Sequence, residues 1–194
     1  KQIIYQRSEH ICALDKPNDI SWDEFVNFSI KIECIPLDSH DPLYILHTSG
    51  TTGIPKGIVR TNGGHAVALV NSMKMTYDIT KDDIFWAASD VGWVVGHSYI
   101  VYAPLLLGCT TVLYEGKPTG TPDPGQFWRI ISEYKVRTMF TAPTAIRAIK
   151  KEDPDGKVLK KYDLKNLKYI FLAGERADPD SIRWTMNMTK KPVI

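Results

Sequence analysis

Residues 47–65, HTSGTTGIPKGIVRTNGGH, form the stretch of this sequence whose side chains are best suited to bind an anion. The stretch holds five glycines, five threonine or serine hydroxyls and one lysine, Lys56. Glycine allows the backbone to turn through positive φ, so that consecutive amide groups can point into one concavity. The hydroxyls add neutral donors and Lys56 adds a point charge. Together these groups suit a polyphosphate.

The loop does not spell the common lysine loop of nucleotide-binding proteins. That motif has glycine directly before the lysine and serine or threonine directly after it, whereas here Pro55 precedes Lys56 and Gly57 follows it. A dinucleotide fingerprint of three spaced glycines also fails. A hairpin loop without a ligand is the plainer alternative. The position of Lys56 and the strand-like run before the loop favour phosphate binding.

The hydrophobic pattern indicates the elements that must position this loop. Short apolar or β-branched runs predict strands at 43–47, 83–88, 110–114, 137–141 and 168–173. Near-helical spacing predicts helices at 62–75, 97–107, 124–134, 143–151 and 179–188, and the segment 97–107 is apolar nearly all round, as a fully buried helix would be. Strands that alternate with helices predict an α/β fold with a mainly parallel sheet and helices on both faces.

Four loops of unusual composition each follow one of the predicted strands. They read TSGTTGIPKG, SDVGWVVGH, TAPT and AGER. Ligands of parallel sheets bind at the carboxyl ends of the strands. We therefore expect these loops to contribute to one site.

The chain divides by regularity into two parts. Residues 1–40 are irregular, with a β-like run at 3–6, a helix that begins after Ser21 and extends to 28, and the linker-like IPLDSHDP. Residues 41–194 contain the regular alternation. The chain lacks an initial methionine and ends in mid-pattern, so we expect a piece of a longer protein.

Composition excludes several classes of protein. Of the 194 residues, 43% are hydrophobic and 24% charged, and the net charge of +2 gives no reason to expect nucleic acid or an anionic membrane as a partner. No run approaches the roughly 20 apolar residues of a membrane span. Cys12, Cys34 and Cys109 lack metal-ligand spacing and indicate reduced thiols in an intracellular compartment. Nothing in the composition indicates an oligomeric state.

Residues 48–57, TSGTTGIPKG, closely resemble the signature loop of the AMP-forming acyl-CoA synthetases of the adenylate-forming superfamily. The resemblance covers at least residues 41–176 and includes DVGWVVGHSY, TTVLYEGKP, TAPTAIRA and AGE. These strings resemble the short-chain branch, acetyl- and propionyl-CoA synthetases, and LYEGKPTGTPDPG and LAGER resemble its propionyl-type members. The resemblance implies an acid–thiol ligase that uses ATP, Mg²⁺ and CoA, and places residues 41–194 in the central α/β part of the large N-terminal, AMP-binding domain.

The resemblance also implies roles for the glycine loop. Its residues would cradle the β- and γ-phosphates of ATP: Thr48, Ser49, Gly50, Thr51, Thr52, Gly53, Lys56 and Gly57. Lys56 would be catalytic, because it counters the negative charge that develops as pyrophosphate leaves. No carboxylate pair in the sequence stands out as a site for Mg²⁺.

Three further groups of site residues follow from the resemblance. Gly174, Glu175 and Arg176 align with the Gly-Glu-Pro of the adenine site, although Arg176 replaces proline. Without the resemblance, a solvated strand end is the preferred interpretation of Glu175. Trp93 and Val94 align with acyl-pocket residues, with a core aromatic as the alternative for Trp93. The CoA-binding positions are Val95, which lacks the threonine hydroxyl of the family, and Thr119, which replaces an asparagine.

Expectations for Ala173 and for the pair His97 and Ser98 complete this interpretation. Ala173 falls where acetyl-specific members carry valine, and the smaller side chain predicts preference for propionate over acetate, with butyrate still open. His97 and Ser98 do not form a nucleophile–base pair, because adjacent residues do not face each other on a helix. A buried, hydrogen-bonded histidine, or one that shapes the acyl pocket, is the expectation for His97.

The later machinery of the family, including the C-terminal domain with its catalytic lysine, does not occur in these residues. We therefore expect the isolated chain to make no acyl-CoA. The alternatives are an adenylate-forming ligase for another carboxylic acid, against which DVGWVVGHSY argues, and a non-catalytic nucleotide-binding module. The expected partners are small molecules, and the expected compartment is the cytoplasm or the mitochondrial matrix.

Overall fold

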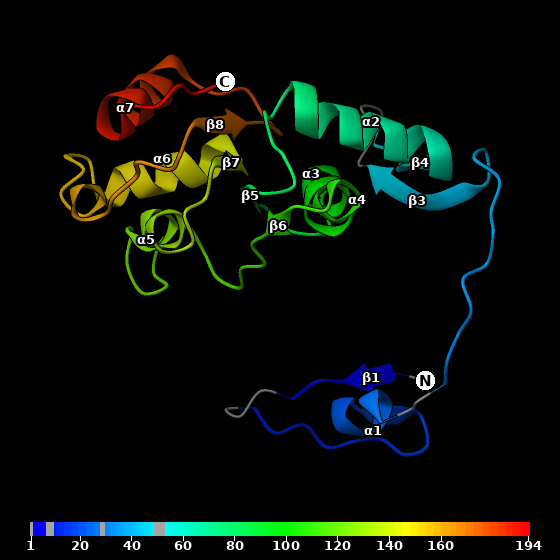
Figure 1. Cartoon of the computed structure of the whole chain (residues 1–194). Coiled ribbons are helices and arrows are strands. Elements are labelled where there is room, and N and C mark those ends of the chain that lie inside the picture. Colours follow the sequence, from blue (N-terminus) through cyan, green and yellow to red (C-terminus); the bar gives the residue numbers. More distant parts are fainter. Residues whose placement is uncertain (1, 7–9, 28–29, 49–52) are drawn as a thin grey trace. The chain divides into compact units, whose positions relative to one another are not determined.

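The computed structural model describes residues 2–6, 10–27, 30–48 and 53–194 (Figure 1). The chain forms two compact units, Lys1–Leu37 and Asp38–Ile194. In the first unit, strands β1 (Gln2–Ile4) and β2 (Asp19–Ser21) pair in parallel. Helix α1 (Trp22–Val26) follows directly. The Ser21 hydroxyl caps its first turn by accepting a hydrogen bond from the Glu24 amide at 3.1 Å.

The second unit contains a four-stranded, all-parallel sheet. Its strands lie in the order β6 (Thr110–Thr111), β5 (Ile84–Ala88), β7 (Thr138–Thr141) and β8 (Tyr169–Leu172). The helices are α2 (Asn62–Met75), α3 (Val94–Gly96), a π-helical segment (His97–Tyr102), α4 (Ala103–Leu107), α5 (Gln126–Glu133), α6 (Pro143–Glu152), a 3-10 turn (Leu159–Lys161) and α7 (Pro179–Thr189). The expected strand at 110–114 is shorter than predicted.

Successive residues of the central strands point to opposite faces of the sheet, and each face has its own apolar cluster. Trp86, Met139 and Ile170 pack on one face with buried residues of α5, α6 and α7. Phe85 and Phe140 pack on the other face, against residues of α2 and α4. Figure 1 shows these two groups of helices on either side of the strands. The predicted α/β class, with a parallel sheet covered on both faces, is confirmed.

The expectation of one fully buried helix at 97–107 is wrong. The segment divides into a π-helical turn and the short helix α4, and the chain then leaves through Gly108 in the left-handed region. Ala103 is fully buried, but Leu105 is 69% exposed. Only one face of the segment packs on the sheet, so an apolar composition does not indicate burial all round.

Strand β4 was not predicted. β3 (Pro42–Thr48) and β4 (Lys56–Thr61) form an antiparallel hairpin that is separate from the parallel sheet. Ile58 and Val59 of β4 are 40% and 54% exposed, so the strand forms through pairing with β3 and not through burial of an alternating face. The glycine loop therefore connects two hairpin strands, and the strand before it does not belong to the parallel sheet.

Candidate functional site

The hairpin register holds the two ends of the glycine loop together. Thr48 lies directly opposite Lys56, and both residues are exposed. Directly opposed residues of an antiparallel pair have Cβ atoms about 5 Å apart. The side chains of Thr48 and Lys56 are therefore attached to the backbone at neighbouring points. Gly53 has φ +79°, the turn conformation expected of a glycine in this loop. Ser49, Gly50, Thr51 and Thr52 lie outside the described residues.

Gly57 has a packing role that the sequence did not indicate. A Cβ at this position would lie 2.9 Å from Ile45 Cγ2 and 3.2 Å from His47 Nε2 on the facing strand. Both distances are shorter than ordinary van der Waals contacts. A side chain larger than that of glycine at this position would push against Ile45 and His47. Gly57 therefore leaves room for the Ile45 and His47 side chains beside the Thr48–Lys56 pair.

Three of the four expected loops lie at one edge of the parallel sheet. The Thr141 hydroxyl donates to the Ala88 carbonyl at 2.9 Å, and the Ala173 amide donates to the Thr141 carbonyl at 3.1 Å. These bonds join the carboxyl ends of β5, β7 and β8. The SDVGWVVGH, TAPT and AGER loops begin at this edge, whereas the glycine loop lies on the hairpin.

The loop after β5 forms a tight turn around Asp90. The Gly92 amide donates to Asp90 Oδ1 at 2.7 Å and the Trp93 amide donates to the Asp90 carbonyl at 3.1 Å. A Cβ on Gly96 would lie 1.9 Å from that same carbonyl oxygen. Gly96 therefore allows α3 to approach the Asp90 backbone closely. This role was not predicted. The second glycine of DVGWVVGH was the one feature of the sequence that pointed to it. The turn leaves the Trp93 side chain 72% exposed, so Trp93 is not a core aromatic.

Val94 and Val95 lie beside a small cavity. The cavity has a volume of about 250 Å³ and is also lined by Arg60 and His65. Burial, with the Arg60 and His97 charges, lowers the pKa of His65. Val95 and Ala173 both pack against the apolar cluster that contains Phe140, so these two expected site residues share one part of the core.

His97 packs between aromatic rings. Its ring centroid lies 4.5 Å from that of Tyr44 and 5.2 Å from that of Tyr102, both in edge-on geometry. Within the described residues, His97 Nε2 is buried without a hydrogen-bond partner, so the expectation of a hydrogen-bonded histidine is not met at this nitrogen. Ser98 is buried, and nothing in the geometry makes the two residues a nucleophile and its base.

The AGER loop is attached to α6 by a charge pair. Gly174 takes φ +99°, and Glu175 Oε1 then accepts a hydrogen bond from Arg147 Nη2 at 2.7 Å. Arg147 Nη1 also lies 3.6 Å from Asp178 Oδ2. Glu175 is therefore paired and not merely a solvated strand end, while Arg176 is exposed. The sequence did not predict Arg147, whose only signal was a charge in TAPTAIRA.

Asp178 follows the AGER loop and is the N-cap residue of α7. Its Oδ1 accepts a hydrogen bond from the Ser181 amide at 2.8 Å, the usual N-cap contact. The Ser181 contacts, followed by Arg147, lower the pKa of the Asp178 carboxyl. The carboxylate that caps α7 therefore stays charged at neutral pH, beside the Arg147 guanidinium.

Thr119 lies half-buried in the loop between β6 and α5. The Tyr114 hydroxyl and Thr121 Oγ1, 2.9 Å apart, hold this loop closed. The loop and the end of β5 together line a cavity of about 760 Å³, in which Asp90 and Pro118 take part. The position expected to contact CoA is thus next to the loop after β5.

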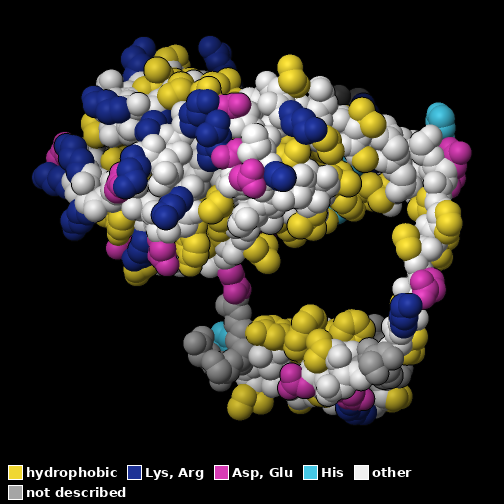
Figure 2. All heavy atoms as spheres, in the orientation of Figure 1, with side chains coloured by type: hydrophobic (Ala, Val, Ile, Leu, Met, Phe, Trp, Pro, Cys, Tyr) yellow, Lys and Arg dark blue, Asp and Glu magenta, His cyan; other side chains and the backbone are white. Residues whose placement is uncertain are grey.

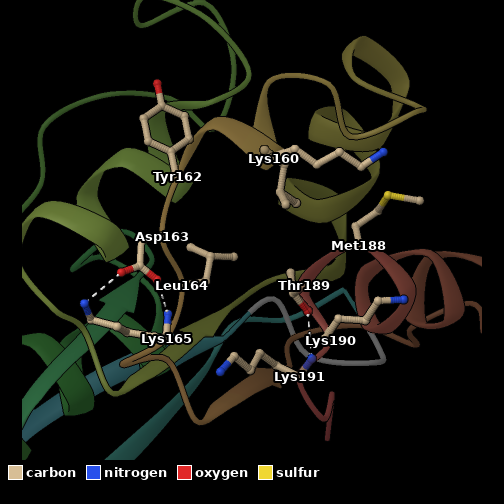
Figure 3. Close-up of a pocket in the computed structure, with 10 residues that line it drawn as sticks. Lys160, Tyr162, Asp163, Leu164, Lys165, Met188, Thr189, Lys190 and Lys191 are labelled. Atoms are coloured by element: carbon tan, nitrogen blue, oxygen red, sulfur yellow. Dashed lines mark hydrogen bonds and ion pairs between the residues drawn. The ribbon is translucent and has the colours of Figure 1, made fainter.

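A third cavity lies at the opposite end of the strands. It has a volume of about 330 Å³, and Figure 3 shows lysine side chains around it together with Asp163, which pairs with Lys165 at 3.0 Å. One group of its lining residues precedes β8 in the sequence, and the other precedes Val193, which forms a parallel bridge with Ile170 of β8. Both groups therefore lie at the amino ends of the strands. Figure 2 shows that many Lys and Arg side chains gather over the α5–α7 part of this unit. None of the expected site residues that the structure describes lines this cavity.

Among the residues that the structure describes, no group of three or more His, Cys, Asp or Glu side chains could hold a metal ion. These residues do not fit an Mg²⁺ site by themselves. Across the same described ranges, every helix falls short of the length and hydropathy that crossing a membrane requires. Cys12 and Cys34 are exposed free thiols, and Cys109 is a buried one.

Comparison with known proteins gives consistent matches. The family model of the AMP-binding enzymes matches residues 5–194. The human mitochondrial acyl-CoA synthetase short-chain family member 3 is 50% identical over 195 residues, which cover 100% of this chain and 28% of that protein. An uncharacterized protein of Pseudomonas aeruginosa is 51% identical over 98% of this chain and 30% of its own length. An acetyl-coenzyme A synthetase of Laribacter hongkongensis is 41% identical over 95% of this chain and 28% of its own length.

The chain thus spans less than a third of the length of these relatives, and the match nevertheless runs over nearly all of the chain itself. The relatives that carry a functional name are acyl-CoA and acetyl-CoA synthetases, which are AMP-forming ligases. The family match includes both the glycine hairpin and the carboxyl edge of the parallel sheet. This chain belongs to the AMP-binding enzyme family, and it is similar to part of the short-chain acyl-CoA synthetases.

Proposed function

We propose that the protein containing this chain activates a short-chain carboxylate with ATP and transfers the acyl group to CoA. One carboxylate oxygen bonds to the α-phosphorus of ATP as the bond from that phosphorus to pyrophosphate breaks. The CoA sulfur then bonds to the acyl carbon, AMP leaves, and the thiol proton passes to solvent. The observation that carries the proposal is the glycine hairpin, with Thr48 opposite Lys56, within a chain that the family matches throughout.

In this proposal the hairpin binds the β- and γ-phosphates. The exposed ammonium of Lys56 lies at the mouth of a loop rich in hydroxyls, where a preplaced positive charge stabilises departing pyrophosphate. The described members of the set are Thr48, Gly53, Lys56 and Gly57, and Ser49 to Thr52 complete it by resemblance. Lys56 acts through its charge and transfers no proton.

The carboxyl edge of the sheet takes the other parts of the substrates. Gly174, Glu175 and Arg176 are proposed to line the adenine site. Trp93, Val94 and Ala173 are proposed to form the acyl pocket. The exposure of Trp93, next to a turn that Asp90 fixes, is what a side chain available to a ligand requires.

Val95 and Thr119 are proposed to contact CoA. Val95 can offer only apolar contact, whereas the Thr119 hydroxyl can donate or accept a hydrogen bond. Ala173 in place of valine leaves room for about one more methylene, which is worth roughly 1–3 kcal/mol in an apolar pocket. Propionate is accordingly the proposed preferred acid.

The test is ATP-dependent release of pyrophosphate by the full-length protein, with acids of two to six carbons. The expected result is the highest kcat/KM with propionate and formation of the matching acyl-CoA. Lys56→Ala should lower kcat at least tenfold, because the charge acts on the leaving group. Lys81→Ala, which removes an exposed lysine from the loop between α2 and β5, is the matched control.

The outcomes separate the alternatives. Activity of Lys56→Ala equal to that of the parent protein would favour a non-catalytic nucleotide-binding module. Efficient use of aryl or long-chain acids in place of short ones would indicate a different adenylate-forming ligase. The isolated chain is expected to form no acyl-CoA, and the proposed compartment is the cytoplasm or the mitochondrial matrix.

A further inference from the structure

Two cationic side chains of helix α6 hold the segment that leads into α7: Arg147 contacts the loop before α7, and Lys150 contacts α7 itself. Arg147 reaches Glu175 and Asp178, and Lys150, almost one turn further along, pairs with Asp180. The backbone that carries them is fixed, because Ile146 and Ile149 of the same helix are fully buried. Both cationic side chains are therefore attached to a helix that is held in place by its buried face. Of the two, Arg147 is the one that contacts a residue of the AGER loop.

The AGER loop itself lacks the usual source of stiffness. Arg176 stands where the family's Gly-Glu-Pro has proline, so the fixed φ of proline is missing at this position. Gly174, with φ +99°, adds a residue with a large conformational range. A loop of this composition needs contacts from elsewhere to hold one side-chain orientation.

Arg147 supplies such contacts at both ends of the loop. Its guanidinium donates to Glu175 at 2.7 Å and lies 3.6 Å from Asp178, which in turn caps α7. A guanidinium has several donors in one rigid plane, so it can set the relative position of two carboxylates. The Arg147 and Glu175 side chains are 39% and 38% exposed, which leaves Glu175 open to a ligand.

We propose that Arg147 is a positioning residue, which holds Glu175 in the orientation that receives the adenine of ATP. The inference rests on the proposed adenine role of Glu175. Arg147 contacts no substrate in this arrangement, and its effect passes through Glu175. The clamp takes over the stiffening that proline provides in the Gly-Glu-Pro loop.

The test compares ATP affinity and kcat in the full-length protein. Arg147→Ala should weaken ATP binding about five- to tenfold, the effect expected for loss of one partly exposed charge-assisted hydrogen bond. KM for the carboxylate should stay unchanged, and Arg147→Lys should restore part of the affinity. Lys150→Ala, which removes the neighbouring ion pair between the same helices, is the matched control and should leave ATP binding unchanged.

A double-mutant cycle shows whether Arg147 acts through Glu175. If it does, Arg147→Ala combined with Glu175→Ala should bind ATP as weakly as Glu175→Ala alone. Full additivity, or normal ATP binding by Arg147→Ala, would overturn the inference. So would an equal loss of affinity in Lys150→Ala, because that result indicates a general loosening of α6 and α7.

The outcome for Glu175→Ala separates this inference from the proposed function. If Glu175→Ala bound ATP normally, the adenine role of Glu175 and the positioning role of Arg147 would both be wrong. Pyrophosphate release by the parent protein would still support the proposed activity. Absence of pyrophosphate release with every acid, by contrast, would remove the proposed function itself.

Discussion

Replacement of Gly96 by alanine tests the tightest backbone approach in the expected acyl loop. The new methyl carbon would lie 1.9 Å from the Asp90 carbonyl oxygen and 2.5 Å from its carbon. Carbon and oxygen approach to about 3.3 Å even in weak hydrogen bonds. One side of the turn would therefore have to move by more than 1 Å.

The cost of this movement can be bounded. Overpacking of this kind costs about 1–3 kcal/mol, and it is at the upper end here because the obstacle is backbone, which cannot rotate away. Alanine regains about 1 kcal/mol over glycine through helix propensity. We expect Gly96→Ala to lower the free energy of unfolding by about 2 kcal/mol. For a chain of this size the Tm should fall by about 4–8 °C.

The assay is urea unfolding of the chain followed by tryptophan fluorescence, with Gly64→Ala as the matched control. Gly64 lies in the first turn of α2, where an added methyl carbon would meet only the Thr61 hydroxyl, at 3.1 Å. The control should change stability by less than about 1 kcal/mol, in the stabilising direction. Equal stability of Gly96→Ala and the parent chain would refute the tight Asp90–Gly96 turn.

Three further predictions concern a thiol, an ion-pair network and the acyl pocket. Burial raises the pKa of the Cys109 thiol to about 11. At pH 8 a thiol reagent should therefore modify exposed Cys12 and Cys34 and leave Cys109 of the folded chain unmodified. Rapid reaction of Cys109 would contradict its burial. Hydrogen bonds from Lys168, then Arg137, hold the pKa of Asp78 below its ordinary 3.8, so Asp78 stabilises the fold above that pH. Asp78→Asn should cost up to about 1 kcal/mol in unfolding experiments at pH 7, and the difference should vanish as the pH falls through the lowered pKa. In the full-length protein, Ala173→Val should reduce the kcat/KM ratio of propionate to acetate at least tenfold, and an unchanged ratio would show that Ala173 does not limit the acyl pocket.

Local patterns predicted the parts of the fold that local physics determines. The spacing at 62–75 matches α2, and the strands predicted at 83–88 and 137–141 match β5 and β7 to within one residue. Strand β4 was missed because its exposed apolar residues carry no alternating signal, and only pairing with β3 makes it a strand. The segment 97–107 was misjudged because composition cannot tell which face packs on the sheet.

The site shows the same division. Gly53 and Gly174 take the positive φ angles that glycine-rich loops require. The Arg147–Glu175 contact, by contrast, joins residues 28 positions apart, and a single charge within TAPTAIRA gives no sign of its partner. The close approach of Gly96 to Asp90 likewise depends on the path of the turn between them. Residue types predicted chemistry, whereas the contacts that orient those residues required the tertiary structure.

The separation of the β3–β4 hairpin from the parallel sheet has a consequence for the timing of a reaction cycle. The two ladders are distinct, so the hairpin can open without breaking a ladder bond of β5, β7 or β8. Elements that open alone do so at lower free energy than the whole domain. If the protein carries out the proposed reaction and the hairpin holds pyrophosphate, the first product can depart while the carboxyl edge of the sheet still binds the acyl-adenylate.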